Sequence, residues 1–172
     1  MKNAIEVLRS RRSIRTYASQ PVERAIIEEI VDCGRLAPTA QNDQPWDFVV
    51  ITSKEKLATI PPMLGHAAYI ANSAFSILVL ARPTQYAVED CSAAIENLLI
   101  AAEAHGIGSC WVAGTQQAYA PVVARAFGAP EDRQLIAIVS FGYPAEEVTI
   151  EKRSLADVLH WDSFRLPSAD PR

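Results

Sequence analysis

The sequence predicts one domain in which helices cover both faces of a β-sheet, and three observations lead to this prediction. The runs FVVI (48–51), FSILVLA (75–81) and LIAIVSF (135–141) are short, apolar and rich in Val, Ile and Phe. None of them shows the polar alternation of a strand with one face in water. The segment 88–106 is apolar over much of its circumference, which is typical of a buried helix. No repeat, low-complexity tract or linker divides the 172 residues, so a single domain over 1–172 is expected.

The N-terminal part is expected to hold two helices. Ile5 and Leu8 have the spacing of a short first helix. Four apolar residues between 26 and 31 recur at i, i+3, i+4 spacing and predict a second helix with one buried face. Gly34 and Pro38 are expected to end that helix.

The remaining elements follow in chain order. The three apolar runs are expected to be central strands covered on both faces. Between the last two, the buried helix 88–106 is followed by a second helix over 119–128. Residues 157–172 predict one helical turn and an extended tail. The tail from about residue 161 has no local core for its apolar side chains and is expected to pack on a second subunit; these side chains are Trp161, Phe164 and Leu166.

Composition and charge exclude several classes of protein. A chain with 49% hydrophobic and 21% charged residues is an ordinary globular protein. The net charge of −4 argues against a nucleic-acid partner. No stretch approaches the ~18 apolar residues of a membrane span, so no membrane partner is expected. Three cysteines without CxxC spacing favour a reducing, cytoplasmic location.

No frame for side-chain catalysis or metal binding occurs in the sequence. The three histidines lie in no GxSxG or HExxH pattern, and no His, Cys or carboxylate pair has ligand spacing. The glycine-rich GIGSCWVAG (106–114) lacks the GxGxxG spacing of a dinucleotide fold. A reaction carried by a bound cofactor is the remaining interpretation of the polar motifs.

Two polar motifs flank the second predicted helix. RRSIR (11–15) offers guanidinium groups and a hydroxyl that match a phosphate. The side chains of TAQNDQ (39–44) donate and accept hydrogen bonds, which suits the pyrimidine edge of a flavin. Together they point to flavin mononucleotide (FMN). Taken singly, an arginine cluster is also typical of a solvated face, and Asn, Asp and Gln before a strand are typical of a loop.

The order of these motifs resembles the nitroreductase family of FMN-dependent oxidoreductases. RRSIRTY is followed by about twenty residues of predicted helix and then by APTAQNDQPWDFVVI. The later segments GIGSCWVAG, LIAIVSFGYP and KRSLADVLHW extend the resemblance over nearly the whole chain. The resemblance implies the α+β class, a three-layer α-β-α sandwich and an intertwined homodimer with FMN at the subunit interface.

The resemblance also assigns cofactor contacts. The N-terminal phosphate and ring contacts are Arg11, Arg12, Ser13 and Arg15, and a further phosphate contact is Arg153. The loop that reaches the flavin of the partner subunit contains Pro38, Thr39, Ala40, Asn42 and Gln44. The backbone that passes the reactive flavin nitrogen N5 contains Trp111, Val112, Ala113 and Gly114. The N–H of Ala113 or Gly114 is expected to hydrogen-bond N5. Ala113 stands where many relatives carry an acidic residue.

The implied activity is a two-step hydride transfer, from NADH or NADPH to FMN and from FMN to a flat acceptor such as a nitroaromatic, a quinone or an enone. No side chain is expected to act as a nucleophile. Three alternatives stay open at this level. They are a different flavin reaction (flavin breakdown, reductive dehalogenation or substrate dehydrogenation), a non-catalytic flavin-binding protein, and a flavin-free dimer.

Overall fold

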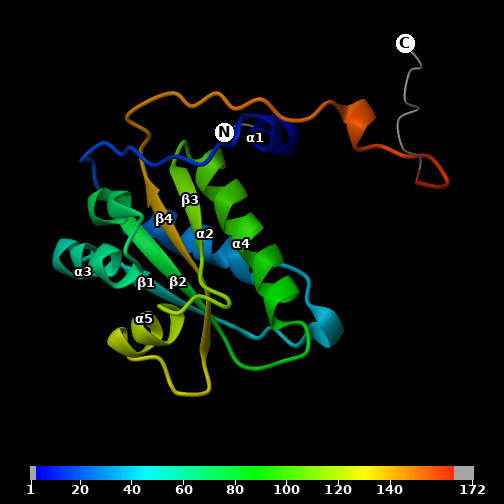
Figure 1. Ribbon diagram of the computed structural model, residues 1–172. Coiled ribbons are helices and arrows are strands. Elements are labelled where there is room, and N and C mark those ends of the chain that lie inside the picture. Colours follow the sequence, from blue (N-terminus) through cyan, green and yellow to red (C-terminus); the bar gives the residue numbers. More distant parts are fainter. Residues whose placement is uncertain (1–2, 165–172) are drawn as a thin grey trace, which may run out of the picture.

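A four-stranded antiparallel sheet lies between two layers of helices (Figure 1). The computed structural model describes residues 3–164. The strands are β1 (Trp46–Ile51), β2 (Phe75–Ala81), β3 (Gly108–Ala113) and β4 (Gln134–Gly142), in the spatial order β1-β2-β4-β3. Every neighbouring pair is antiparallel. β2 and β4 are therefore the central strands, and β1 and β3 form the two edges.

Helices α2 (Arg24–Arg35) and α4 (Ala87–Ala104) cover one face of the sheet. Their core side chains and those of the sheet include Ile27, Ile30, Ile95, Leu98, Phe75, Ile77, Val79 and Phe141. Gly34 lies inside α2 and does not end it. A β-carbon at Gly34 would lie 2.5 Å from Cδ2 of Leu98, so the glycine allows α2 to approach α4 closely.

Helices α3 (Lys54–Leu64) and α5 (Ala120–Ala126) cover the opposite face. This second core includes Leu57, Ile60, Val123, Leu78, Leu80, Val112 and Ile138. The sequence did not indicate α3, because Pro61 and Pro62 inside it are signals for a helix break. Ser53 caps its first turn, and Gly65 with φ of 73° ends it. The three-layer arrangement expected from the resemblance is confirmed.

The expected central position is right for two of the three apolar runs. β2 is buried along its whole length, and β4 is buried from its second residue onward. The prediction for 48–51 was wrong, because β1 is an edge strand whose Val50 is 39% exposed. An apolar run signals partial burial of its side chains but does not tell a central strand from an edge.

The first helix and the C-terminal segment differ in detail from the expectation. Helix α1 (Ala4–Ser10) begins with a capping box between Asn3 and Glu6, and its buried residue is Val7. Both Ile5 and Leu8 are more than half exposed. The helical turn near the end is the short 3-10 helix η3 (Leu155–Asp157). The expectation for Leu166 and the end of the tail lies outside the described residues.

The N-terminal segment 13–17 crosses one end of the sheet over two glycines. Ser13 pairs with Ser109 of β3, and Tyr17 pairs with Pro144 just after β4. A β-carbon at Gly108 would lie 2.6 Å from Cγ1 of Ile14, and one at Gly142 would lie 2.9 Å from Cδ1 of Tyr17. Gly108 and Gly142 therefore leave the space in which this segment packs.

Candidate functional site

The predicted arginine motif lies beside the first residues of β3. The N–H of Ile14 donates to the carbonyl oxygen of Ser109 at 2.9 Å. The N–H of Ala18 donates to the carbonyl of Tyr143, also at 2.9 Å. These bonds fix the path of the chain on both sides of Arg15, next to the edge strand β3.

The arginines of this motif differ in what they contact. Arg11 Nε lies 3.4 Å from Oε1 of Glu96 on α4. Arg12 Nη1 donates to the carbonyl oxygens of Arg9 and Arg11 at 2.9 and 2.8 Å, so it satisfies carbonyls at the C-terminus of α1. Arg15 is exposed, and its guanidinium carbon lies 5.9 Å from the ring centre of Tyr69. Arg15 is therefore the arginine best placed to meet an external anion, and Ser13 is half-buried beside it.

A partly buried polar network lies next to Arg15. The hydroxyl of Tyr69 lies 3.2 Å from Sγ of Cys110 on β3. The hydroxyl of Tyr17 donates to the carbonyl of Ile14 at 2.7 Å and lies 2.8 Å from Oγ of Ser140 on β4. Desolvation raises the pKa of both tyrosines above their ordinary value. The network ties the arginine segment to the two strands that it crosses.

The open edge of β3 presents backbone groups to the outside. The N–H of Gly114 donates to the carbonyl of Ile136 at 2.9 Å, inside the sheet. Because antiparallel pairing alternates between residues that face the partner strand and residues that face away, the N–H of Ala113 and that of Trp111 point away from β4. Of the two amides expected at flavin N5, the one of Gly114 is thus used within the sheet, and the one of Ala113 faces outward.

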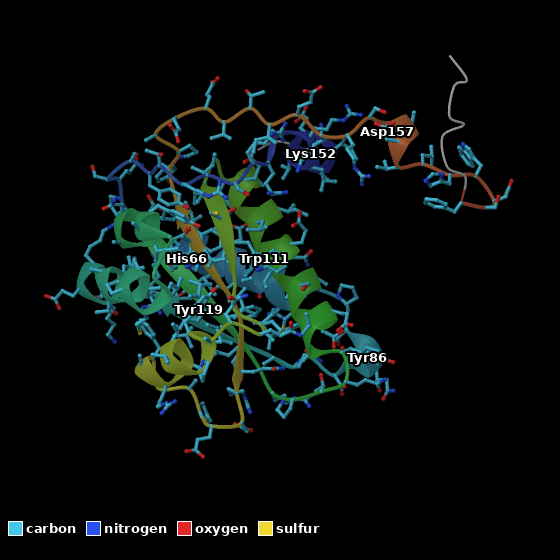
Figure 2. All side chains as sticks on the ribbon, in the orientation of Figure 1. His66, Tyr86, Trp111, Tyr119, Lys152 and Asp157 are labelled. Atoms are coloured by element: carbon cyan, nitrogen blue, oxygen red, sulfur yellow. The ribbon has the colours of Figure 1, made fainter. Side chains whose placement is uncertain are left out.

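Aromatic side chains surround this edge. Trp111 is 37% exposed, and the Val112 side chain between Trp111 and Ala113 is buried in the core. The hydroxyl of Tyr119 donates to the carbonyl of Ala113. The ring of Tyr119 lies 5.7 Å from that of His66, and both residues lie beside β3 (Figure 2). The edge of β3 therefore combines outward polar backbone with flat side chains.

The carboxamide loop, defined as residues 38–44 between α2 and β1, has an unusual backbone. It contains the 3-10 turn η1 (Ala40–Asn42), and the φ angles of Gln41, Asn42 and Gln44 are 54°, 60° and 46°. A residue other than glycine pays about 1 kcal/mol for this left-handed conformation, somewhat less for Asn. Pro38 and the side chains of Gln41, Asn42 and Gln44 are exposed, whereas Thr39 and Ala40 are half-buried.

Within one chain the structure does not bring the carboxamide loop to the arginine motif. Ala40 contacts Asp90 in the first turns of α4. Ser10, next to the arginine motif, contacts Glu103 near the other end of the same helix. The 13 residues from Asp90 to Glu103 correspond to about 20 Å along α4. The loop therefore contacts the first turn of α4, whereas Ser10 contacts the last turn and Arg11 reaches back only to Glu96 in the middle of the helix.

Arg153 lies in the extended segment that follows β4. The N–H of Ala145 donates to the carbonyl of Thr16 at 3.0 Å, and Oγ1 of Thr16 donates to Glu146 at 2.6 Å. From there the segment runs along the same end of the molecule as α1, and Figure 2 shows Lys152 beside that helix. Arg153 is exposed. The structure thus places it at the same end of the molecule as the arginine motif.

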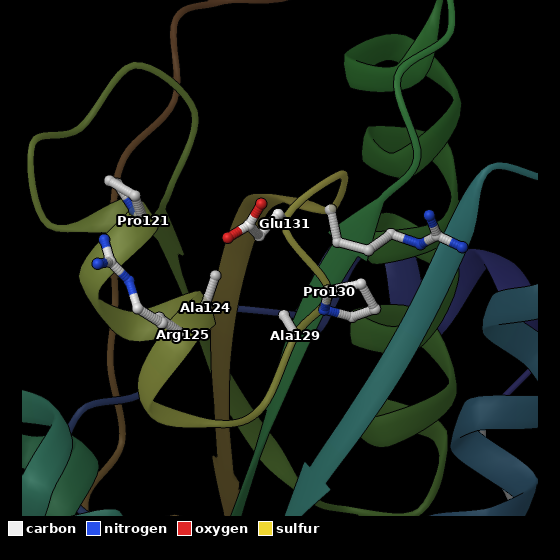
Figure 3. A pocket seen from close by; sticks show the side chains of 7 residues that line it. Pro121, Ala124, Arg125, Ala129, Pro130 and Glu131 are labelled. Carbon is white, nitrogen blue, oxygen red and sulfur yellow. The ribbon is translucent and has the colours of Figure 1, made fainter.

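A cavity of about 320 Å³ lies between α5 and the connection to β4 (Figure 3). Its lining residues include Pro121, Arg125, Pro130 and Glu131. Arg133, which also lines it, already pairs with Asp47 and Asp132 at 2.6 Å. Because Arg133 directly precedes β4, the cavity lies beside the start of that strand. The nine residues of β4 correspond to about 27 Å. This cavity is remote from the arginine motif.

Residues 3–164 contain neither a candidate metal-binding cluster nor a helix that could cross a membrane. These residues contain no group of three or more His, Cys, Asp or Glu arranged to hold a metal ion. Their helices include none long and apolar enough to cross a membrane.

Sequence reasoning missed four side chains around these elements, which are Tyr69, Arg82, Asp90 and Tyr119. Arg82 follows β2 and donates from Nη2 to the carbonyl of Asp43. Asp90 accepts a hydrogen bond from the N–H of Ala40 at 3.0 Å. An acidic residue in the first turns of a helix usually complements the helix dipole, so no sequence signal marks Asp90 as a contact of the loop.

The chain belongs to the nitroreductase family, whose model matches residues 8–79 and 62–143. A protein of Archaeoglobus fulgidus, provisionally named NADH dehydrogenase/NAD(P)H nitroreductase, is 34% identical over 154 residues, which cover 86% of this chain and 88% of the relative. A crystal structure from Bacteroides thetaiotaomicron with the same provisional name has a TM-score of 0.88 at 29% identity, over 95% of this chain and 100% of the other. An FMN-dependent nitroreductase from Clostridium difficile has a TM-score of 0.87 at 26% identity, over 93% and 99%. The predicted family and the α+β fold are confirmed.

Replacing Tyr17 with Phe is expected to lower the free energy of unfolding near neutral pH by about 1 to 2 kcal/mol, because the hydrogen bonds to Ile14 and Ser140 are lost. Burial raises the pKa of Tyr17, so its contribution is fully present below the unfolded pKa of about 10 and is lost as pH rises above it. The variant should therefore lose less stability at alkaline pH than the wild type does. Urea unfolding near neutral pH and at a pH above about 10 measures these free energies. Tyr86→Phe, at an exposed position, serves as control, and equal pH dependence in Tyr17→Phe and wild type would contradict the assignment.

Proposed function

We propose that the protein is an FMN-dependent NAD(P)H oxidoreductase that reduces a flat acceptor such as a nitroaromatic, a quinone or an enone. The observation that carries the proposal is the open edge of β3, where the amide of Ala113 faces outward at the end of the strand whose first residues contact the arginine motif. Family membership supports the class of reaction. The printed names of relatives, an FMN-dependent nitroreductase and an NAD(P)H nitroreductase, support the cofactor and the electron donor.

The residues present fit FMN in three respects. An exposed guanidinium, that of Arg15, lies at the end of the sheet where a phosphate is expected, and Lys152, the neighbour of Arg153 in the chain, lies beside α1 in Figure 2. The amide of Ala113 is a donor aimed away from the sheet. The carboxamides of Asn42 and Gln44 are exposed and can pair with a ring edge that alternates donors and acceptors.

FMN, when bound, supplies the hydride chemistry between NAD(P)H and the acceptor. The chain's own task is then to bind and orient. Arg15, Arg153 and Ser13 would hold the phosphate, the Ala113 amide would donate a hydrogen bond to the ring, and the exposed Trp111 would supply a flat apolar surface for orienting it. We assign no side chain a covalent role.

We further propose that the working unit is a homodimer with a shared site. The segment after β4 exposes large apolar side chains, with Trp161 75% and Phe164 74% exposed, and α1 exposes Ile5 and Leu8. Such an apolar surface favours association. In a shared site the carboxamide loop of one chain would lie at the arginine motif of the other; within one chain the loop and the motif contact different turns of α4. In this proposal residues 1–172 form a single FMN-binding domain whose tail from about residue 161 packs on the partner.

The first expected outcome is that the purified protein carries FMN and that NAD(P)H bleaches its visible absorbance under anaerobic conditions. Release of the cofactor followed by chromatography identifies the flavin. FAD, or no flavin after incubation with FMN, would contradict the proposal. Bound FMN that NAD(P)H does not bleach would instead support a non-catalytic flavin-binding protein, and product analysis with NADH separates reduction from the other flavin reactions.

Arg15→Ala and Arg153→Ala are each expected to weaken FMN binding by about 1.5 to 3 kcal/mol, because a charge-assisted hydrogen bond to phosphate is lost. This corresponds to a factor of about ten to a hundred or more in Kd, measured by quenching of flavin fluorescence. Arg24→Ala, which removes an exposed arginine of α2, is the matched control and should bind FMN like the wild type. A variant at Arg15 that binds FMN at wild-type strength would show that this arginine is a solvated surface charge.

The dimer is tested by sedimentation of the full-length protein at micromolar concentration. We expect a dimer that loses FMN only when it dissociates or unfolds, because a large apolar interface couples association to folding. Truncation before Trp161 should weaken dimerisation and FMN retention together. A stable monomer that keeps FMN and oxidises NAD(P)H would refute the shared site.

A further inference from the structure

Asp90 on α4 is a charged residue in a buried position. Asp90 is only 5% exposed to solvent. Oδ1 accepts a hydrogen bond from the backbone N–H of Ala40 at 3.0 Å, whereas Oδ2 is buried without a hydrogen-bond partner among the described residues. A buried carboxylate with one unpaired oxygen lowers stability. The dipole of α4 favours an acidic residue in this first turn, but it does not account for a carboxylate that is buried with one oxygen unpaired.

The N–H that donates to Asp90 belongs to Ala40 of the carboxamide loop, in which three residues other than glycine adopt positive φ. Such a conformation persists only where the surrounding structure holds it. The three residues are Gln41, Asn42 and Gln44; the first two follow Ala40 directly, and Asp43 with φ of −65° separates them from Gln44. Asp90 thus contacts the loop at the point where the left-handed stretch begins.

Arg82 holds the other end of the same stretch. Its Nη2 donates to the carbonyl of Asp43, and its backbone N–H donates to the carbonyl of Pro45 at 3.0 Å. Within the loop, the N–H of Gln44 donates to Oγ1 of Thr39 at 3.2 Å. Asp90 and Arg82 lie outside the loop and carry opposite charges. They hydrogen-bond to the loop backbone on either side of Asn42.

We propose that Asp90 and Arg82 are positioning residues that hold the carboxamide loop in its left-handed conformation, so that Asn42 and Gln44 are oriented toward the flavin before it binds. This inference rests on the proposed function of the loop in FMN binding. Neither residue touches the cofactor in this proposal. Both act through the backbone of residues 40–45, to which every contact described above is made.

The test compares Asp90→Ala with Asp90→Asn. Alanine removes the acceptor for the Ala40 N–H, whereas asparagine keeps an acceptor oxygen at the same place. In the flavin-free protein, amide hydrogen exchange of residues 40–44 should be about tenfold or more faster in Asp90→Ala. FMN titration should show binding weaker by about tenfold or more in the same variant and within about threefold of the wild type in Asp90→Asn. Glu89→Ala, an exposed acidic residue in the same turn of α4, is the control and should change neither measurement.

The outcomes separate this inference from the proposed function. A wild type that binds no FMN would overturn the proposed function. A wild type that binds FMN together with an Asp90→Ala variant of equal affinity and equal exchange would overturn only the positioning role. An Asp90→Asn variant as weak as Asp90→Ala would also overturn it, because the acceptor for Ala40 is retained there.

Alanine at a buried position can unfold the chain, so Arg82→Ala provides a second, more exposed variant. It should accelerate exchange at Asp43 and Gln44 and weaken FMN binding by about fivefold or more, since one hydrogen bond to the loop backbone is lost. Arg82→Lys, which keeps a donor, should restore most of the affinity. Arg82→Ala with wild-type exchange and affinity would count against the proposal, and Arg24→Ala is its charge-matched control.

Discussion

The close packing of residues 13–17 on Gly108 and Gly142 is the constraint on which the candidate site depends. Ile14 and Tyr17 occupy the space that a side chain would fill at these two glycines. The packing of Ile14 and Tyr17 on these glycines fixes the position of Arg15 beside the sheet. It also determines which residues of β3 remain at the open edge. Because the same segment also contacts Pro144 and Ala145, it sets the direction in which the chain continues toward Arg153. The crossing of residues 13–17 over Gly108 and Gly142 thus positions three parts of the sequence, which are the arginine motif, β3 and the segment that leads to Arg153.

Charge and burial are distributed differently at the two ends of α4. Toward its C-terminal end, Ser10 contacts Glu103, and Arg11 pairs in the middle of the helix with the partly exposed Glu96; such exposed pairs contribute little to stability. At its N-terminal end, Asp90 is buried against a strained loop. The first end is suited to receiving an anion, since its guanidinium groups are reachable from water. The second is suited to fixing backbone geometry, since its contacts are desolvated and local.

The sequence predicted the layers of the fold well because long apolar segments leave little choice of environment. Periodicity located α2, α4, α5 and the central strands β2 and β4. It could not tell that β1 is an edge, because Val50 is as apolar as its buried neighbours. It also missed β3, whose residues Gly108 and Ser109 carry no strand signal and are ordered by the segment that packs on them.

The resemblance named the residues of the site, but the roles within it needed geometry. The pairing of β3 with β4 distinguishes the amide of Ala113 from that of Gly114, and no residue type encodes that difference. The engagement of Arg12 with carbonyls of α1 likewise follows from three-dimensional placement. The contact between Asp90 and Ala40 joins residues fifty positions apart, which no local pattern reveals.

The alternation along β3 has a consequence for how this sequence can vary. What Ala113 offers at the open edge is its backbone, so many side chains can stand at this position while the outward amide stays in place, with proline excluded because it lacks an N–H. Insertion or deletion of a single residue between Gly108 and Gly114 is different. It would shift the pairing by one, turn the outward amides into the sheet and move Val112 from the core to solvent. Among homologous chains, the number of residues in this strand should therefore vary far less than their identity.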